Sequence, residues 1–233
     1  MKGIFYGIGV GPGDPELLTL KAVNLIKQAD IIIAPKTEKK EESTALAIAK
    51  PHIQAETTVM DMVFPMVYNP AALNEAWQSN RDAICDLLAN GKKVVFLTLG
   101  DPMLYSTYIY VFNLLKDCGY AIETVPGITS FCAIGSRLGF PLAEGNDVLS
   151  VIPATAEDAV LDKALATADS AVVLKVNRNF DSLVEKLDKS GLLANAVMVT
   201  KCGHEDEEIV TDLRAAGGQK VNYLSAIVTR RTK

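Results

Sequence analysis

Three short loops hold the residues of this 233-residue chain whose types and spacing could do chemistry. The first, Gly9–Asp14, follows an apolar run at residues 3–9 and reads Gly-Val-Gly-Pro-Gly-Asp. Three glycines within five residues favour a backbone that a ligand approaches closely. The dinucleotide pattern G-x-G-x-x-G needs its third glycine one residue later, so the spacing argues against that kind of nucleotide site. The alternative is that the glycines only permit a tight turn from strand to helix.

The second loop, Leu99–Pro102, follows a strongly apolar run at residues 93–99. Ligands of open parallel sheets collect at the carboxyl ends of strands, where this loop should lie. Gly100 would let a ligand approach the backbone, and the Asp101 carboxylate could accept hydrogen bonds from hydroxyl or ammonium groups. The alternative is that Asp101 caps a helix, which we expect to run on to about Lys116.

The third loop spans residues 125–130 and reads Val-Pro-Gly-Ile-Thr-Ser. Its small polar side chains and main-chain amides could bind a polar ligand at another strand-to-helix turn. The alternative is that Thr129 is the N-cap of the helix that follows to Leu138.

Two further groups of residues carry weaker signals. Tyr105, Tyr108 and Tyr110 lie close together, and on a helix Tyr105 and Tyr108 would share a face, which is typical of packing. The run at residues 203–208 combines a histidine with acidic residues and is typical of a solvated turn more than of a metal site.

The loops need a scaffold in which strands alternate with helices, and the apolar pattern provides one. Strands are expected at residues 3–9, 30–34, 57–62, 93–99, 122–125, 147–152, 170–176, 196–201 and 221–228. Helices are expected at residues 15–26, 43–49, 69–88, 102–116, 130–138, 157–166 and 180–189. This alternation predicts an α/β protein of two α/β domains with mainly parallel mixed sheets. We expect the domains to span residues 1–122 and 123–233, with a hinge at residues 119–126.

Composition excludes several classes of protein. The net charge of −5 and pI near 5.2 argue against a nucleic-acid partner, and the basic pair Arg230-Arg231 is expected in a solvated tail. The chain has no apolar run long enough to cross a membrane, and its first residues do not suggest a signal peptide, so we expect a cytoplasmic protein. Four cysteines without a Cys-x-x-Cys pair make a structural metal site unexpected.

Taken together, the three loops resemble those of the tetrapyrrole methylase family. The extended second loop, Gly100–Tyr108, resembles the branch that methylates C20 of precorrin-2 or its cobalt form. Other branches commonly have Gly-Gly-Asp-Pro here, and Leu99 departs from that pattern in the direction of the C20 branch. The order and spacing of the loops cover the N-terminal half, and the C-terminal strands fit the second domain of that family.

The resemblance implies a homodimer of two-domain subunits, with the cofactor S-adenosyl-L-methionine folded in the cleft between the domains. It places cofactor contacts at Pro12, Leu99, Gly100, Asp101, Leu104, Thr129, Ser130, Lys175, Val176 and Gly203. The first loop would border the trough of the tetrapyrrole substrate, which assigns substrate binding to Gly9, Gly11, Gly13 and Asp14.

The implied chemistry suits a chain with only two histidines. A meso carbon of a reduced tetrapyrrole is enamine-like and can attack a sulfonium methyl group directly, so alignment is the main task of the protein. A weak base or water must then take the proton from C20. Tyr105 and Tyr108 are candidates for that base, but packing is the more typical role of both, and no catalytic residue is assigned.

Other functions stay open at this stage. The substrate could be cobalt-factor II, which we favour, or metal-free precorrin-2. A relative that acts on a macromolecule, of the diphthine synthase or rRNA 2′-O-methyltransferase type, and a non-catalytic tetrapyrrole-binding protein are the alternatives.

Overall fold

A computed structural model describes residues 2–36, 43–65 and 70–232 of the chain, and the side chains of residues 70–74 are not described. Asn69, the expected start of the long helix, lies outside the described residues. The chain divides into two compact units, Met1–Thr129 and Ser130–Lys233. The described part contains no helix that is both long and apolar enough to cross a membrane.

The first unit is built on a parallel sheet of five strands in the order β3-β2-β4-β1-β5. Its strands are β1 (Ile4–Gly9), β2 (Ile31–Lys36), β3 (Thr58–Val63), β4 (Lys93–Thr98) and β5 (Ala121–Val125). The central strand β4 is buried from Val94 to Thr98, as expected for a parallel strand that is covered on both faces. The apolar runs in the sequence therefore predicted these strands closely.

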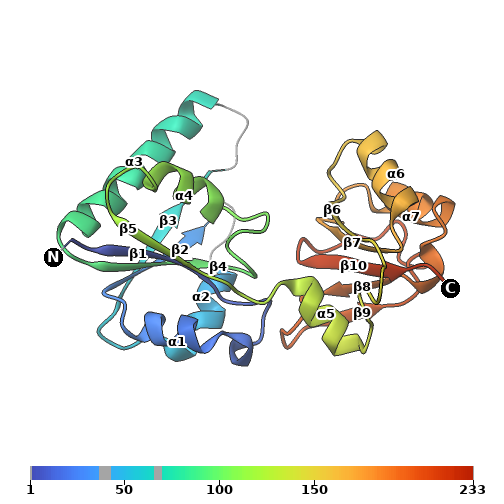
Figure 1. Cartoon of the computed structure of the whole chain (residues 1–233), viewed down its shortest axis with the longest axis horizontal. Coiled ribbons are helices and arrows are strands. Elements are labelled where there is room, and N and C mark those ends of the chain that lie inside the picture. The colour runs from blue at the N-terminus through green and yellow to red at the C-terminus, as the bar shows by residue number, and fades with distance from the viewer. Residues whose placement is uncertain (1, 37–42, 66–69, 233) are drawn as a thin grey trace. The chain divides into compact units, whose positions relative to one another are not determined.

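Helices cover both faces of this sheet (Figure 1). They are α1 (Leu20–Lys27), α2 (Thr44–Ala49), α3 (Pro70–Ala89) and α4 (Tyr108–Leu115), with short 3-10 helices η1 (Pro15–Leu17) and η2 (Lys50–His52). Ile26 and Ile48 from α1 and α2 pack on one face of the sheet, and Ile84 and Leu115 from α3 and α4 pack within the core of the other. The two faces thus hold separate apolar cores.

The first helix begins later than expected. Asp14 caps η1 by accepting a hydrogen bond from the Glu16 amide at 2.8 Å, but the chain is extended again at Leu18 and Thr19. Thr19 then supplies its own cap to α1, accepting from the Ala22 amide at 3.2 Å. The single helix that was expected from Pro15 is therefore two helices, η1 and α1, each with its own N-cap.

The second unit has a mixed five-stranded sheet in the order β6-β7-β10-β8-β9. Its strands are β6 (Leu149–Pro153), β7 (Ser170–Leu174), β8 (Val197–Thr200), β9 (Glu208–Val210) and β10 (Ser225–Arg230). Strands β6 and β7 pair in parallel, and β10 runs antiparallel to both β7 and β8. Strands β6, β7 and β8 therefore run in the same direction, and their carboxyl ends lie at one edge of the sheet.

Helices also cover both faces of the second sheet (Figure 1). Helices α6 (Asp158–Thr167) and α7 (Phe180–Lys189) pack on one core, and α5 (Ser130–Leu138) packs on the other. A short 3-10 helix, η3 (Leu193–Asn195), precedes β8. The α/β class with mainly parallel mixed sheets is confirmed, although the antiparallel pairs of the described sheets all lie in this unit.

Two expected boundaries differ from the structure. Strand β5 pairs with β1 from Ile4 to Ile8, so it belongs to the first unit, and a boundary after residue 122 would cut through it. The last strand begins at Ser225 and not at Val221, and the short strand β9 was not expected. The short length and exposed pattern of β9 leave little apolar signal in the sequence.

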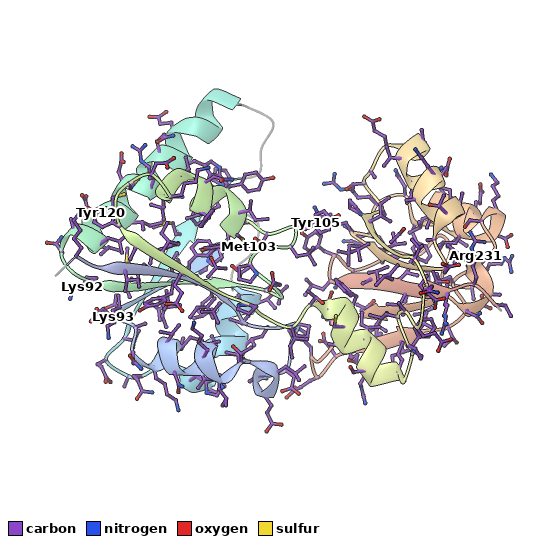
Figure 2. All side chains as sticks on the ribbon, in the orientation of Figure 1. Lys92, Lys93, Met103, Tyr105, Tyr120 and Arg231 are labelled. Carbon is purple, nitrogen blue, oxygen red and sulfur yellow. The ribbon has the colours of Figure 1, made fainter. Side chains whose placement is uncertain are left out.

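Arg230 and Arg231 are not in a solvated tail. The Arg230 guanidinium donates to Glu144 at 2.6 Å and to Asp147 at 2.7 Å. Arg231, labelled in Figure 2, donates to the carbonyl groups of Leu165 and Ala168 at 2.9 and 2.8 Å. These carbonyls lie at the end of α6, where main-chain acceptors lack helical partners, so Arg231 caps that helix.

Candidate functional site

The three glycine-containing loops lie next to one another at the carboxyl edge of the first sheet. They follow β1, β4 and β5, and β1 lies between the other two strands. Gly11 and Gly100 form an isolated antiparallel bridge, in which the Gly100 amide donates to Gly11 at 2.8 Å and the Gly11 amide donates back at 3.3 Å. The first and second loops are therefore in direct contact within the first unit.

Glycine is required where the loops meet, and we call the backbone contact of Gly9, Gly100 and Gly127 the glycine junction. A Cβ atom on Gly9 would lie 2.5 Å from the Gly127 nitrogen and 2.6 Å from the Gly100 oxygen. A Cβ atom on Gly127 would overlap the same Gly100 oxygen. Loop packing thus explains Gly9, and a φ of +79° explains Gly11, so both have structural roles besides any ligand contact.

Beside the backbone of Gly100, the second loop leaves space that a ligand could enter. The φ of +70° at Gly100 favours glycine, and no atom of the described chain lies within 4 Å of the position that a Cβ would take. By contrast, Gly9 to Gly13, including Pro12, are buried, while Asp14 is partly exposed. Of the first loop, Asp14 therefore has the side chain that is most accessible to a substrate.

Asp101 links two loops and does not cap a helix. One carboxylate oxygen accepts from the Met103 amide at 2.9 Å, and the other accepts from the Gly127 amide at 3.1 Å. The helix expected from residue 102 begins only at Tyr108, because the chain from Pro102 to Thr107 forms an irregular segment. Leu104 lies in this segment, half-buried.

Two threonine hydroxyls beside these loops are buried without a hydrogen-bond partner among the described residues. They are Thr98 Oγ1, directly before the second loop, and Thr129 Oγ1, at the end of the third. Thr129 stands directly before α5, but its hydroxyl caps no amide of that helix. A buried hydroxyl without a partner is costly, so these atoms fit a site that completes its hydrogen bonds with a polar ligand or water.

The second unit brings Lys175, Val176 and Gly203 to one edge of its sheet, while Ser130 begins α5. Leu174, the last residue of β7, pairs with Ala226, and Thr200, the last residue of β8, pairs with Ser225. The turns after β7 and β8 therefore begin on either side of the start of β10. Lys175 has a φ of +57°, which is uncommon for a residue with a side chain. Val176 is fully buried, so only its backbone is available to a ligand.

Glu207 fixes the turn that contains Gly203. It accepts from the Gly203 amide at 2.8 Å and from Arg137 Nε, on α5, at 3.0 Å. Burial raises the pKa of this carboxyl, but the Gly203 amide and Arg137 outweigh burial, and the pKa lies below its usual value. The neighbouring Cys202 thiol has a pKa raised to about 11, by burial and by the charge of Glu207. The acidic run is thus only partly a solvated turn.

The tyrosines do not share a helical face. Tyr108 is fully buried, its ring packs on Phe5 and Phe96, and its hydroxyl lies 2.6 Å from Thr124 Oγ1. Burial also raises the pKa of the Tyr108 hydroxyl, and its packing is that of a core residue. Tyr105 is 47% exposed, and Figure 2 shows it with Met103 on the irregular segment, where its φ is +50°.

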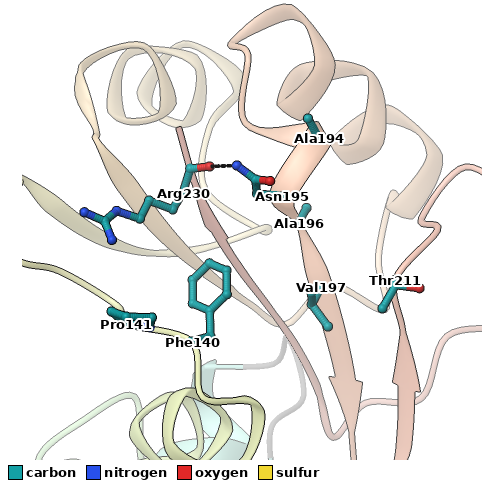
Figure 3. A pocket seen from close by; sticks show the side chains of 8 residues that line it. All are labelled: Phe140, Pro141, Ala194, Asn195, Ala196, Val197, Thr211 and Arg230. Carbon is teal, nitrogen blue, oxygen red and sulfur yellow. Dashed lines mark hydrogen bonds between the residues drawn. The ribbon is translucent and has the colours of Figure 1, made fainter. Parts of the chain in front are cut away.

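A separate cavity of about 390 Å³ lies in the second unit near the start of β8 and the end of β10 (Figure 3). Its walls include Phe140, Pro141 and Val197, and the Asn195 amide donates to the Arg230 carbonyl at 3.1 Å. It contains none of the expected site residues and lies at the opposite sheet edge from Gly203. A smaller polar cavity, about 290 Å³, includes Lys201 and Asp206 in the turn that also contains Gly203.

Comparison with known proteins identifies the class. A family model described as Tetrapyrrole (Corrin/Porphyrin) Methylases matches residues 5–216, so the chain belongs to the tetrapyrrole methylase family. A cobalt-precorrin-2 C(20)-methyltransferase of Salmonella typhimurium is 34% identical and covers 99% of this chain and 98% of its own length. A precorrin-2 C(20)-methyltransferase of Sinorhizobium sp is 31% identical, with 97% of this chain and 94% of its own covered.

Solved structures agree on the fold. A cobalt precorrin-4 methyltransferase superposes with a TM-score of 0.77 at 21% identity, over 97% of this chain and 94% of its own. A uroporphyrin-III C-methyltransferase from Thermus thermophilus, complexed with S-adenosylhomocysteine, superposes with a TM-score of 0.70 at 23% identity. The superposition covers 98% of this chain and 92% of that one.

Sequence reasoning missed several residues that shape the site. Gly127 lies in the third loop, but the sequence assigned it no structural or binding role, because its close approach to Gly100 depends on the order of the strands. Thr98 was part of an apolar run, and nothing in the sequence marks its hydroxyl as unpartnered. The Arg137–Glu207 pair joins residues 70 positions apart, which a single sequence does not reveal.

Proposed function

We propose that this chain transfers a methyl group from S-adenosyl-L-methionine to C20 of a precorrin-2-type tetrapyrrole in cobalamin biosynthesis. The observation that carries the proposal is the match, over nearly the whole chain, to relatives named for that reaction. The three adjoining loops support it, because they expose main-chain groups and a half-buried carboxylate at the edge of a parallel sheet.

We assign the cofactor contacts to the residues that the family resemblance implies. The set is Pro12, Leu99, Gly100, Asp101, Leu104, Thr129, Ser130, Lys175, Val176 and Gly203. The donor and acceptor chemistry of the set fits S-adenosyl-L-methionine, which carries hydroxyl, ammonium and carboxylate groups. The unpartnered Thr129 hydroxyl supports this assignment, because a polar ligand would give it a partner. Substrate contacts are assigned to Gly9, Gly11, Gly13 and Asp14, among which Asp14 has the most accessible side chain.

S-Adenosyl-L-methionine supplies an electrophilic methyl group when it is bound. The residues of this chain then have to hold that methyl group in line with C20, exclude water and leave room for the C20 proton to depart. Alignment of this kind can lower a barrier by about 7–11 kcal/mol in favourable systems. This role needs rigid loops more than a strong acid or base, which agrees with the closely packed glycine junction and the burial of Tyr108.

The form of the substrate is tested by a side-by-side assay. The protein is incubated with labelled S-adenosyl-L-methionine and either cobalt-factor II or metal-free precorrin-2. We expect label at C20 with the cobalt form in preference, because the more similar relative is named for a cobalt substrate. Transfer to neither compound would contradict the proposed reaction, and transfer to the metal-free form alone would reverse the preference.

Two further assignments stay predictions: a homodimer, and a cytoplasmic location without a nucleic-acid or membrane partner. The acidic charge balance supports only the lack of a nucleic-acid partner, and it disfavours an RNA substrate.

A further inference from the structure

We propose that Cys85 and Cys118 form a site of oxidative modification, at which a hydroperoxide closes a disulfide between helix α3 and the turn after α4. Cys85 lies in the second half of α3, and Cys118 lies between α4 and β5. The strands that follow these segments, β4 and β5, start at the amino edge of the first sheet, whereas the loops assigned to cofactor and substrate lie at its carboxyl edge. The inference is therefore independent of the proposed function.

The packing of α3 and α4 on the same face of the first sheet brings the two thiols together (Figure 1). Both cysteines contact the apolar core that contains Leu88 and Leu115, and the Cys118 side chain is a hydrogen-bonding neighbour of the Cys85 thiol. The Arg81 guanidinium interacts electrostatically with both thiols, so the two sulfur atoms lie near one charged group. A disulfide requires its sulfur atoms to approach to about 2.05 Å, which thiols already in contact can do more easily than distant ones.

The exposure of the pair differs from that of the other two cysteines. Cys85 and Cys118 are both half-buried, so a small oxidant can reach them, while the surrounding core limits access by a second protein molecule. Cys132 is exposed on α5, and Cys202 is buried beside Glu207. These two cysteines lie in the second unit and supply controls within the same chain.

The surroundings of Cys85 set how readily the pair reacts. Its pKa is raised to about 11, mainly by burial and next by the Cys118 thiol, and Asp82 acts in the same direction. Arg81, one helical turn earlier on α3, acts in the opposite direction. Because the thiolate is the form that attacks a peroxide, Cys85 should respond to a higher oxidant concentration than a sensor cysteine of low pKa does.

The closing reaction consumes one hydrogen peroxide molecule for each disulfide. One sulfur attacks a peroxide oxygen, the O–O bond breaks, and a sulfenic acid forms as the other oxygen leaves as water. The second sulfur then attacks the sulfenic sulfur, the S–O bond breaks, and the oxygen leaves as water with the proton of the second thiol. The two thiols lose two electrons and two protons in all, and the peroxide takes them up.

The test oxidises the reduced full chain with hydrogen peroxide, alkylates the remaining thiols in urea, and maps the products by mass spectrometry. In the folded chain we expect two thiols to be lost together, a Cys85–Cys118 linked peptide, and full reversal by dithiothreitol. The urea midpoint of the oxidised chain should rise, because the new bond restricts the unfolded chain. The same oxidation in urea should favour Cys118–Cys132, the pair with the shortest intervening segment.

Serine variants separate this pair from the other cysteines. Cys85→Ser and Cys118→Ser should each abolish both the linked peptide and the rise in midpoint, and Cys132→Ser should retain both. Each variant is compared with itself before and after oxidation, so a change in its basal stability does not affect the result. The same mixture of pairings in folded and unfolded chains, or irreversible oxidation of Cys85 or Cys118 without a link between them, would overturn the inference. A midpoint that is unchanged by a confirmed Cys85–Cys118 bond would contradict a link between folded elements.

Discussion

Glu207 accepts one hydrogen bond from the main chain of its own turn and one from Arg137 on α5, and its side chain is 11% exposed. Its pKa lies below the usual value because these donors outweigh burial. A carboxyl with a lowered folded pKa stabilises the fold fully above its unfolded pKa of about 4.3, and this stabilisation is lost as the pH falls through the lower folded pKa.

Glu207→Gln should therefore lower the free energy of unfolding by about 1–2 kcal/mol at neutral pH, because one of two charged hydrogen bonds is weakened. The difference from wild type should shrink as the pH falls below about 4, where the wild-type carboxyl also becomes neutral. Urea unfolding at a series of pH values measures it. The exposed neighbour Glu208 supplies the control, and a Glu208→Gln effect of equal size would show that net charge, and not the Gly203 turn, is responsible.

At the scale of elements, the glycine junction joins the ends of β1, β4 and β5. Gly127→Ala should lower the free energy of unfolding by about 1–3 kcal/mol, because the new Cβ overlaps the Gly100 carbonyl and the loops must separate. It should also weaken S-adenosylhomocysteine binding, because Gly100 and Thr129 move apart. Urea unfolding and calorimetry measure the two effects.

Gly139 gives a control for this substitution. It has a φ of +60° and no atom of the described chain within 4 Å of a Cβ, so Gly139→Ala should cost about 1–2 kcal/mol through backbone strain alone. Ligand affinity should be unchanged in this variant. Equal affinities in wild type and Gly127→Ala would mean that the junction does not set the cofactor site.

The inner strands of the first unit, such as β2 and β4, could be predicted because strands that are buried on both faces leave continuous apolar runs, whereas the edge strands β3 and β5 are largely exposed or half-buried. The segment from Pro102 to Thr107 could not, because its residues fit a helix locally while the Asp101 carboxylate engages two amides in a different arrangement. Arg231 was also misassigned, since the α6 carbonyls that hold it are more than 60 positions away in the sequence. In each case a long-range polar contact overrode the local pattern.

The candidate site was predicted to a similar degree. The three loops were identified because glycine and proline mark strand-to-helix turns in the sequence itself. The roles of individual residues were harder, since Gly127, Thr98 and Glu207 acquire theirs from neighbours that strand order alone brings close.

At the scale of the whole molecule, the four cysteines report on burial in both units. Cys132 is exposed, Cys202 is buried, and Cys85 and Cys118 are half-buried. Burial raises the pKa of Cys202 to about 11; burial and the neighbouring Cys118 do the same for Cys85. Because the thiolate is the reactive form, Ellman's reagent at about pH 8 should label one thiol quickly, and denaturation should release the others.

Cys132→Ser should remove the fast phase and leave the slow ones. Rapid labelling of three or more thiols in the folded wild type would contradict the burial of Cys202 or Cys85. The experiment samples both units in one measurement, because Cys85 and Cys118 lie in the first and Cys132 and Cys202 in the second.

The backbone character of the glycine junction has a consequence for redesign. The loops touch through main-chain atoms at Gly9, Gly100 and Gly127, while the side chain of Leu99, next to the junction, packs against the apolar core on the α1 and α2 face of the sheet. Leu99→Gly would install the Gly-Gly-Asp-Pro pattern of other branches without adding an atom to the contacts of Gly9, Gly100 and Gly127, but it would remove the apolar packing of Leu99. The spacing of the loops is thus set by the backbone at the junction, so a redesign at position 99 has to replace core packing and not the contact between the loops.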